Sequence, residues 1–248
     1  MTSRRTSFVR EAIILAAGNG DRFDDGSPHS KLLTPIAGIP LLARTLTSAW
    51  EAGISDAHVV LGYDAEAVRA LAAEVSPLEL RVYFHLNRDW HHENGVSVLA
   101  ARPFVDGRPF ALMMGDHIFP AEVLSRLIRT PRRRGETLLC IDREPADPEA
   151  AAEATKVRLE GDHISAIGKK LAPYDALDTG LFVCDPSVFA ALERSCAAGD
   201  STLSGGIARL ASERRVRGVD IGDGRWCDID TVADVSIAEA LVEPAFRT

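Results

Sequence analysis

The chain has few of the residues that mark a secreted, zinc-binding or membrane-spanning protein. It contains four cysteines in 248 residues, and they are too far apart to form a C-x-x-C pair or a Cys/His cluster (Cys140, Cys184, Cys196 and Cys227). A disulfide framework and a structural zinc site are therefore not indicated, and reduced thiols favour a cytoplasmic location. No segment approaches the roughly 20 apolar residues that a membrane helix needs.

Positive charge is outnumbered by negative charge in this chain, with 28 Lys and Arg against 36 Asp and Glu. The formal net charge is -8 and the pI is near 5.4, whereas nucleic acids and anionic membrane surfaces are bound by basic faces. Both are therefore excluded as general partners. Residues 1–10 hold three arginines but no apolar core segment, so we interpret them as a disordered polar leader rather than a signal peptide. The apolar content of 46% is enough for one domain over residues 11–248.

Apolar runs alternate with helical segments through the first half of that domain, about residues 11–118. The runs predict strands at 12–15, 57–61, 80–86 and 110–114, and the segments between them predict helices at 40–50, 64–75 and 94–101. Such alternation is typical of a parallel sheet with helices on both faces.

The second half, about residues 119–248, predicts shorter strands. They are expected at 136–142, 155–160, 164–168, 180–184, 216–221 and 225–229, with a hairpin turn at 160–162 and helices at 186–195, 203–211 and 231–242. We expect this half to extend the sheet and to form one wall of a pocket.

A glycine-containing loop follows the first predicted strand. Gly18 and Gly20 allow backbone N–H groups to approach a ligand closely, and Arg22 and Lys31 add positive charge suited to a polyphosphate. The third glycine of the dinucleotide-binding motif and the Gly-Lys-Ser/Thr of a P-loop are both missing, which disfavours an NAD-dependent oxidoreductase. Taken alone, the loop is equally compatible with a simple turn between a strand and a helix.

Carboxylates follow two of the predicted strands. Asp116 comes directly after residues 110–114, and Asp228 and Asp230 lie at the end of residues 225–229. Ligands of open α/β sheets bind outside the carboxyl ends of the strands, where carboxylates and nucleotide phosphates together can hold Mg²⁺. Each aspartate also suits a helix or turn cap, Asp230 more than Asp228. Lysines in the second half are either surface groups or cations for a substrate phosphate, as Lys156 or Lys170 could be.

Together these motifs resemble the nucleotidyltransferases that join a nucleoside triphosphate to a sugar or alcohol phosphate, the MobA-like NTP transferase superfamily. The resemblance covers nearly the whole chain. It rests on Leu-Ala-Ala-Gly-x-Gly-x-Arg at 15–22, Lys31, Gly-Asp at 115–116, Asp-Thr-Gly at 178–180 and Trp-x-Asp-Ile-Asp-Thr at 226–231. Further blocks at 93–97, 114–118, 142–145, 153–157 and 167–169 are most similar to CTP:inositol-1-phosphate cytidylyltransferases. The resemblance implies a Rossmann-like, three-layer α/β/α fold with a mixed, mostly parallel sheet.

The resemblance also implies roles for individual residues. The expected nucleotide contacts are Leu15, Ala16, Ala17, Gly18, Asn19, Gly20, Arg22, Lys31, Asn94 and Gly95, and the expected ligands of Mg²⁺ are Asp116, Asp228 and Asp230. The acceptor is expected to meet Lys156, Asp178, Thr179 and Gly180, with Lys170 as a further cation, and Arg22, Lys31, Asp116 and Lys156 are expected to be catalytic. Two positions depart from the family pattern, since Asp21 stands where relatives often have Thr and Leu32 where many have Pro.

The activity so implied is the condensation of CTP with a phosphorylated alcohol, inositol 1-phosphate above others, to give a CDP-alcohol and pyrophosphate. Phosphocholine, a phosphonate, a sugar 1-phosphate and the molybdenum cofactor stay open as acceptors, and so does a non-catalytic nucleotide-binding protein. Family members often form homodimers. Some relatives are fused to a membrane-embedded transferase that uses the CDP-alcohol, so we expect a separate membrane partner to consume the product here.

Overall fold

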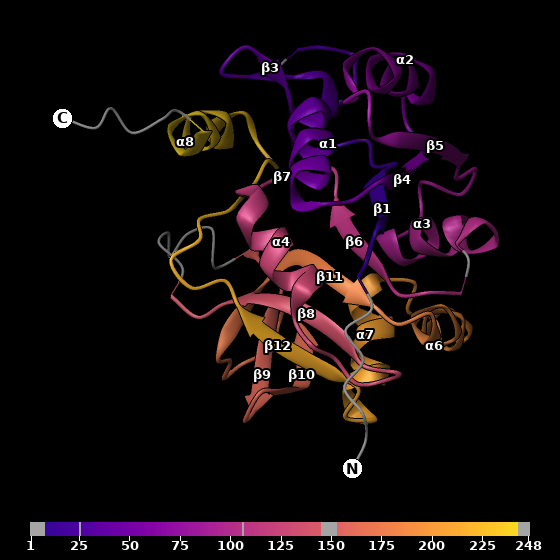
Figure 1. The fold of residues 1–248 in the computed structure, drawn as a ribbon, viewed down its shortest axis with the longest axis vertical. Helices are drawn as coiled ribbons and strands as arrows, with labels where there is room; N and C mark the ends of the chain where they lie inside the picture. Colours follow the sequence, from indigo (N-terminus) through magenta and orange to yellow (C-terminus); the bar gives the residue numbers. More distant parts are fainter. Residues whose placement is uncertain (1–7, 25, 106, 145–152, 243–248) are drawn as a thin grey trace.

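A mixed sheet of nine strands forms the centre of the computed structural model, which describes residues 8–24, 26–105, 107–144 and 153–242 (Figure 1). The strand order is β5-β4-β1-β6-β11-β8-β12-β10-β9. In chain order the strands are β1 (Glu11–Ala16), β4 (Asp56–Leu61), β5 (Arg81–Leu86), β6 (Phe110–Met114), β8 (Thr137–Asp142), β9 (Lys156–Glu160), β10 (His163–Gly168), β11 (Ala176–Cys184) and β12 (Val216–Asp220). All of these strands except β10 and β11 run in the same direction. The predicted mixed, mostly parallel sheet is therefore confirmed.

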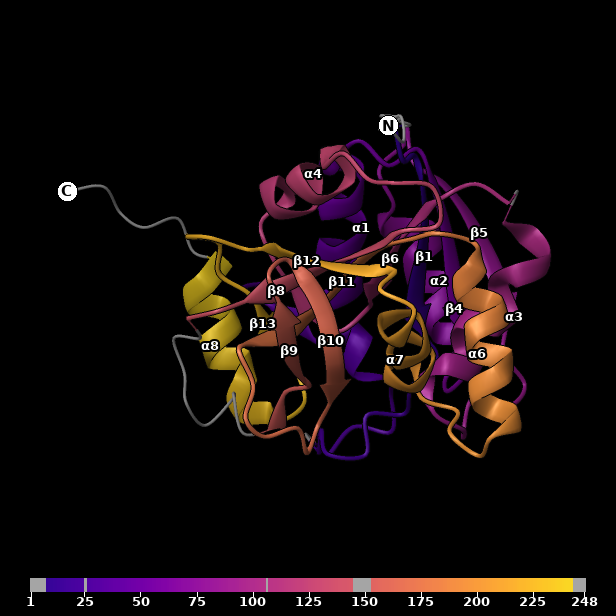
Figure 2. The ribbon, with the colours of Figure 1, turned by 90° about the horizontal axis from the view of Figure 1, so that it is seen from below.

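Helices cover both faces of this sheet. One face packs against α1 (Leu41–Ala52), α2 (Ala65–Val75) and α4 (Ala121–Arg129), and the other against α3 (Asn94–Ala101), α6 (Ser187–Ala197) and α7 (Leu203–Ser212). Figure 2 shows α1 and α4 on the side opposite α6 and α7. The last helix, α8 (Val232–Val242), contacts β13 (Cys227–Asp228), and two short 3₁₀ helices are η1 (Lys31–Leu33) and η2 (Arg102–Phe104).

The first helix shows why the sequence folds as it does. Leu42, Leu46 and Ala49 recur at helical spacing, and all three are fully buried against the sheet. Gly53 ends α1 in the left-handed conformation, with φ of 107°, and its N–H reaches the carbonyls of the last turn.

Several elements differ from the sequence-based expectation. The helix α4 was not predicted, although Val123, Leu124 and Leu127 have helical spacing and are buried. The strand expected at 225–229 is only Cys227–Asp228, and it pairs with β7 (His117–Ile118) rather than with the main sheet. A further small hairpin joins β2 (Pro35–Ile36) to β3 (Ile39–Pro40).

The packed part of the chain begins before the end of the leader predicted at residues 1–10. Residues 1–7 lie outside the described part of the chain, but Val9 is buried in the core and the carbonyl of Arg10 accepts the Ser55 N–H at 2.9 Å. Within the described residues, no helix combines the length and the apolar character needed to cross a bilayer.

Candidate active site

The glycine-containing loop begins where β1 ends, at the carboxyl end of the parallel strands. Ala16 and Ala17 are buried, whereas Gly18 and Asn19 are exposed, so only the tip of the loop is open to a ligand. The N–H of Gly115, which follows β6, donates to the Leu15 carbonyl at 2.9 Å. A Cβ at position 115 would lie 2.6 Å from that oxygen, so the end of β6 can approach β1 only because a glycine is there.

Lys31 links this loop to the carboxylates. Its Nζ atom lies 2.8 Å from Asp116 Oδ2 and 3.2 Å from Asp230 Oδ1, and it donates to the Ile229 carbonyl at 2.6 Å. Its side chain is buried beneath Gly20, where an added Cβ would lie 3.2 Å from Lys31 Cδ. Burial alone would lower the pKa of Lys31, but Asp116 and Asp230 raise it above its ordinary value.

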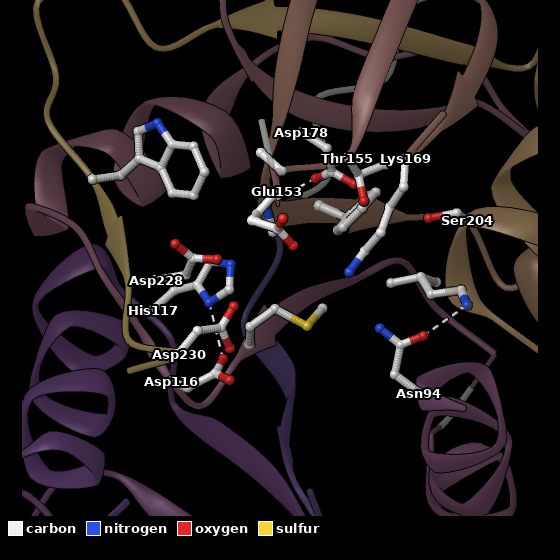
Figure 3. Close-up of a pocket in the computed structure, with 16 residues that line it drawn as sticks. Asn94, Asp116, His117, Glu153, Thr155, Lys169, Asp178, Ser204, Asp228 and Asp230 are labelled. Atoms are coloured by element: carbon white, nitrogen blue, oxygen red, sulfur yellow. Dashed lines mark hydrogen bonds and ion pairs between the residues drawn. The ribbon is translucent and has the colours of Figure 1, made fainter. Parts of the chain in front are cut away.

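Two segments far apart in the sequence bring the predicted carboxylates together. The short strands β7 and β13 pair antiparallel and place Asp228 opposite His117, next to Asp116. The N–H of Ile229 also donates to the Asp116 backbone carbonyl at 3.0 Å. The structure thus brings Asp116, Asp228 and Asp230 together in the lining of one pocket, which Figure 3 shows.

The charges within this cluster are unevenly balanced. Burial would raise the pKa of Asp116, but Lys31 and the hydrogen bond from His117 Nδ1, at 2.9 Å, lower it well below its ordinary range. Burial raises the pKa of Asp228, and the neighbouring Asp230 and Asp116 raise it further against the opposing effect of His117. Burial is therefore the largest cause of the raised pKa of Asp228.

Neither Asp228 nor Asp230 caps the last helix. The carboxylate of Asp234 accepts the backbone N–H groups of Asp230 and Thr231, at 3.0 and 2.7 Å, and the Thr231 hydroxyl at 2.9 Å. The capping alternative for the two predicted ligands is therefore wrong, and both carboxylates remain available to the site.

Arg22 crosses from the loop toward the second half of the chain. Its guanidinium hydrogen bonds to Asp230 and lies 3.5 Å from Glu153 Oε2. Asp21, the departure from the family pattern, is paired with the side-chain amide of Asn19. Both basic residues of the predicted phosphate cradle are thus paired with site carboxylates in this structure.

A pocket extends from the carboxylate cluster toward the start of β11. Its lining residues are Asn94, Met114, Asp116, His117, Glu153, Ala154, Thr155, Lys169, Asp178, Gly180, Phe182, Leu203, Ser204, Trp226, Asp228 and Asp230. Asp178 is held by the Gly180 N–H at 2.8 Å, and burial raises its pKa to about 6. Asn94 accepts the Leu203 N–H at 2.8 Å, which joins α3 to α7 at the edge of the pocket.

Twelve of the predicted contacts do not line this pocket: Leu15 to Gly20, Arg22 and Lys31 belong to the glycine loop and its neighbouring lysine, and the other four lie elsewhere. Thr179 is fully buried, and its hydroxyl donates to the Cys140 carbonyl on β8 at 3.0 Å. Lys156 pairs with Leu177, and opposite residues share a face of a sheet, so it lies on the other face from Asp178. Lys170 is exposed outside the lining, and Gly95 packs where an added Cβ would lie 2.5 Å from the Ser201 carbonyl. The structure therefore places these four residues outside the lining of this pocket.

Several residues of the pocket were not predicted as site residues, although they lie in the sequence blocks that resemble nucleotidyltransferases. Lys169 extends its amino group into the pocket opposite the carboxylate cluster (Figure 3), and Glu153 and Thr155 lie beside it. Trp226 stacks on His117, with ring centroids 5.9 Å apart, and its indole N–H donates to Asp142 at 2.9 Å. The block at 167–169 contained the signal for Lys169, but its sequence did not show which of the neighbouring lysines faces inward.

No metal site is preformed among the residues that the structure describes, because no three of their His, Cys, Asp or Glu side chains are arranged to hold an ion. The donor set itself suits a hard divalent cation, since the carboxylates of Asp116, Asp228 and Asp230 all line one pocket. The arrangement therefore fits an ion that is bound with additional oxygen ligands from a substrate.

Comparison with known proteins agrees with this geometry. Two relatives carry the name bifunctional IPC transferase and DIPP synthase. The one from Rubrobacter xylanophilus is 37% identical over 237 residues, 93% of this chain and 51% of the relative. The one from Aquifex aeolicus is 31% identical over 249 residues, 97% of this chain and 54% of the relative. The chain thus spans about half the length of these curated relatives.

Solved structures show the same fold. The inositol-1-phosphate CTP transferase from T. maritima superposes with a TM-score of 0.84 at 23% identity, covering 96% of this chain and 98% of that one. A UDP-glucose pyrophosphorylase in complex with UDP-glucose gives a TM-score of 0.76 at 16% identity, covering 94% and 97%. The family model described as the MobA-like NTP transferase domain matches residues 12–210. The chain therefore belongs to the MobA-like NTP transferase family.

Proposed function

We propose that this protein is a cytidylyltransferase that condenses CTP with inositol 1-phosphate to give a CDP-alcohol and pyrophosphate. The observation that carries the proposal is that one pocket joins the cluster of Lys31, Asp116 and Asp230 to a second polar wall that contains Lys169 and Asp178. The name IPC transferase of the relatives, which align over more than nine tenths of the chain, supports this acceptor. So does the fold shared with an inositol-1-phosphate CTP transferase.

The proposed reaction is one in-line displacement. An oxygen of the acceptor phosphate attacks the α-phosphorus of CTP, a new P–O bond forms, and the bond to the β-phosphate oxygen breaks with release of pyrophosphate. An ionised phosphate monoester is already a nucleophile, so no general base and no covalent enzyme intermediate are needed. The protein's contribution is to position two polyanions and to offset their mutual repulsion.

The chain's own cations are placed for this task. The Lys31 amine lies beneath the glycine loop and can reach a phosphate bound at the tip of that loop, and Arg22 extends from the same loop. Lys169 lies on the opposite wall, so it replaces Lys156 and Lys170 as our candidate for holding the acceptor phosphate. The three cations would then surround the reacting α-phosphate from two sides.

A divalent cation such as Mg²⁺ fits the cluster of Asp116, Asp228 and Asp230. When bound, it would neutralise charge on the nucleotide phosphates. Its protein ligands would come from the ends of β6 and β13, which β7 holds together.

The acceptor side suits a polyol. Asp178 is a buried carboxyl that lines the pocket, and Glu153, Thr155 and Ser204 add hydrogen-bonding groups around it. A hydroxyl-rich acceptor can satisfy these groups, whereas an apolar one would leave them unpaired at a cost of about 1–3 kcal/mol each. The wall thus favours inositol 1-phosphate over a plain alkyl phosphate.

One relative favours a second acceptor class. The CMP-5'-(3-aminopropyl)phosphonate synthase of Streptomyces rubellomurinus is 38% identical over 122 residues, which is 48% of this chain and 19% of that protein. An aminoalkyl phosphonate would place an ammonium group near Glu153 or Asp178, both of which are acidic lining residues.

A pyrophosphate-release assay tests the proposal. The chain is incubated with Mg²⁺ and each of CTP, UTP, ATP and GTP, in combination with inositol 1-phosphate, 3-aminopropylphosphonate, phosphocholine or glucose 1-phosphate. We expect the pair of CTP and inositol 1-phosphate to give the highest kcat/KM. Release that is faster with the phosphonate would support the second acceptor class, and CTP binding without release on any acceptor would overturn the enzymatic assignment.

A further inference from the structure

The ammonium group of Lys31 occupies the centre of the oxygen cluster. Three oxygens surround Nζ within 3.2 Å, namely Asp116 Oδ2, Asp230 Oδ1 and the Ile229 carbonyl. A lysine ammonium has three hydrogen-bond donors and no acceptor. These three contacts use its full donor capacity, and two of the acceptors, Asp116 and Asp230, are proposed ligands of the divalent cation.

The backbone that carries Lys31 is fixed, so only its side chain can move. Ser30 begins the 3₁₀ turn, its hydroxyl accepts the Leu32 N–H, and its own N–H donates to Asp64 Oδ2 at 3.0 Å. Asp64 stands at the N-cap position of α2, but its carboxylate makes no hydrogen bond to that helix and anchors residue 30 instead.

The Lys31 side chain also lies against the proposed phosphate loop. Its Cγ, Cδ and Cε atoms lie 3.2–3.7 Å from the position that a Cβ on Gly20 would occupy. An amine on this stem can exchange the carboxylates for a phosphate at the loop by turning about its terminal bonds. The long, flexible side chain of lysine permits such movement, whereas the planar fork of arginine is more constrained.

We propose that Lys31 acts as an internal counter-cation that excludes divalent metal from the nucleotide-free protein. A bound polyanionic nucleotide draws the ammonium to its phosphates and so opens Asp116 and Asp230 to the metal. The inference rests on the proposed function of this site. It assigns an order to the ligands, in which the metal binds to the nucleotide complex and only weakly to the free protein.

Manganese binding to the full chain tests this inference without any measurement of turnover. The protein is titrated with Mn²⁺ in the absence of nucleotide, and free Mn²⁺ is followed by electron paramagnetic resonance. Lys31→Met keeps the length of the stem but removes the charge, so we expect it to bind Mn²⁺ at least about tenfold more tightly than the wild type. Lys31→Arg retains the charge and is expected to stay close to the wild type.

Lys169→Met is the matched control. It removes a positive charge from the same pocket, but Lys169 lies on the wall opposite the carboxylates. We expect Mn²⁺ affinity of this variant to change by less than about threefold, since a more distant charge is screened by solvent. Equal Mn²⁺ affinities of the wild type and Lys31→Met would overturn the inference, and so would an equal gain in both lysine variants.

If Lys31→Met does not fold, the unfolding midpoint of the wild type tests the inference instead. Ligands that bind the native state raise its unfolding midpoint. Mn²⁺ alone is expected to leave the midpoint of the wild type unchanged, whereas Mn²⁺ with α,β-methylene-CTP raises it beyond the effect of the analogue alone. An equal rise with Mn²⁺ alone would contradict the inference.

The two proposals can fail separately. If the protein releases no pyrophosphate but Lys31→Met binds Mn²⁺ more tightly than the wild type, the proposed reaction is wrong. The role of Lys31 as counter-cation would then still hold. Pyrophosphate release without that difference overturns only the role of Lys31 in excluding metal.

Discussion

Lys31 is the residue that connects the phosphate loop to the carboxylate cluster. Its amine touches Asp116 and Asp230, while its stem lies under Gly20. Lys31, Asp116 and Asp230 could each be singled out in the sequence, but the ion pairs between them could not, because Asp230 lies nearly 200 residues after Lys31. Only the pairing of β7 with β13 brings them together.

Removal of either charge at this contact should nearly abolish turnover. We expect Lys31→Met and Asp116→Asn each to lower kcat for pyrophosphate release by roughly 10²–10³, or about 2.7–4 kcal/mol, as for other single transition-state contacts. Steady-state kinetics measure this loss, and thermal unfolding monitors the fold. Wild-type turnover in a folded variant of either residue would remove the residue from the mechanism.

The neighbouring lysines 169 and 170 form a matched pair. Lys169 lines the pocket and Lys170 does not, so Lys169→Met should raise the KM for the acceptor or lower kcat by about tenfold or more, the scale of a lost charge-assisted hydrogen bond. Lys170→Met should leave both constants within about twofold of the wild type, since this side chain lies outside the pocket lining. Comparable losses in the two variants would contradict the choice of Lys169.

At the scale of elements, the first half of the chain was predictable because its apolar runs alternate regularly with segments of helical spacing. The strand at 110–114 and the helix at 94–101 have the bounds that the sequence pattern predicts. The second half was harder because β11 inserts between β6 and β8 as an antiparallel strand, which interrupts the regular alternation. The face of the sheet on which each residue of β11 and β9 lies depends on the pairing register of these strands. The sequence alone does not specify that register.

Thr179 shows the consequence. Sequence resemblance placed residues 178–180 together in the acceptor site, yet side chains alternate along a strand. Asp178 therefore faces the pocket while Thr179 faces the interior, where it bonds to Cys140.

A bulge in β11 shapes the same segment. The register with β8 shifts between Asp178 and Phe182, and Gly180 within it has φ of +76°. A Cβ there would lie 2.7 Å from the His117 ring. Bulges of this kind re-aim side chains next to active sites, and here the bulge directs Asp178 into the pocket beside His117.

Gly180→Ala should therefore disturb both fold and site. We expect a loss of about 1–3 kcal/mol in the free energy of unfolding from the strained backbone, together with reduced turnover, because His117 must shift. Chemical denaturation and pyrophosphate release measure the two effects. Gly168→Ala is the control, since nothing lies within 4 Å of its added Cβ, and an equal loss in both variants would rule out this account of the bulge.

At the scale of the whole molecule, the buried carboxyl of Asp178 lowers the free energy of unfolding at neutral pH. Burial raises the pKa of Asp178 to about 6, above the value of about 3.9 in an unfolded chain. The folded state therefore binds more protons than the unfolded state between these values. The contribution of Asp178 to stability is complete below about pH 4 and is lost as the pH rises through 6.

Asp178→Asn should remove this pH dependence. Relative to the wild type, the variant is expected to gain about 2–3 kcal/mol in the free energy of unfolding between pH 4 and pH 7. Urea unfolding of the metal-free protein across this range provides the measurement. Asp223→Asn, on an exposed loop, serves as the control, and parallel stability curves for Asp178→Asn and the wild type would contradict the prediction.

The most direct test of the proposed chemistry follows the acceptor oxygen. The chain is incubated with Mg²⁺, CTP and inositol 1-phosphate whose non-bridging phosphate oxygens are labelled with ¹⁸O, and the products are examined by ³¹P NMR. The account predicts a CDP-alcohol with ¹⁸O in the bridge between its two phosphorus atoms and pyrophosphate without label. Labelled pyrophosphate, or pyrophosphate release without a CDP-alcohol, would contradict it.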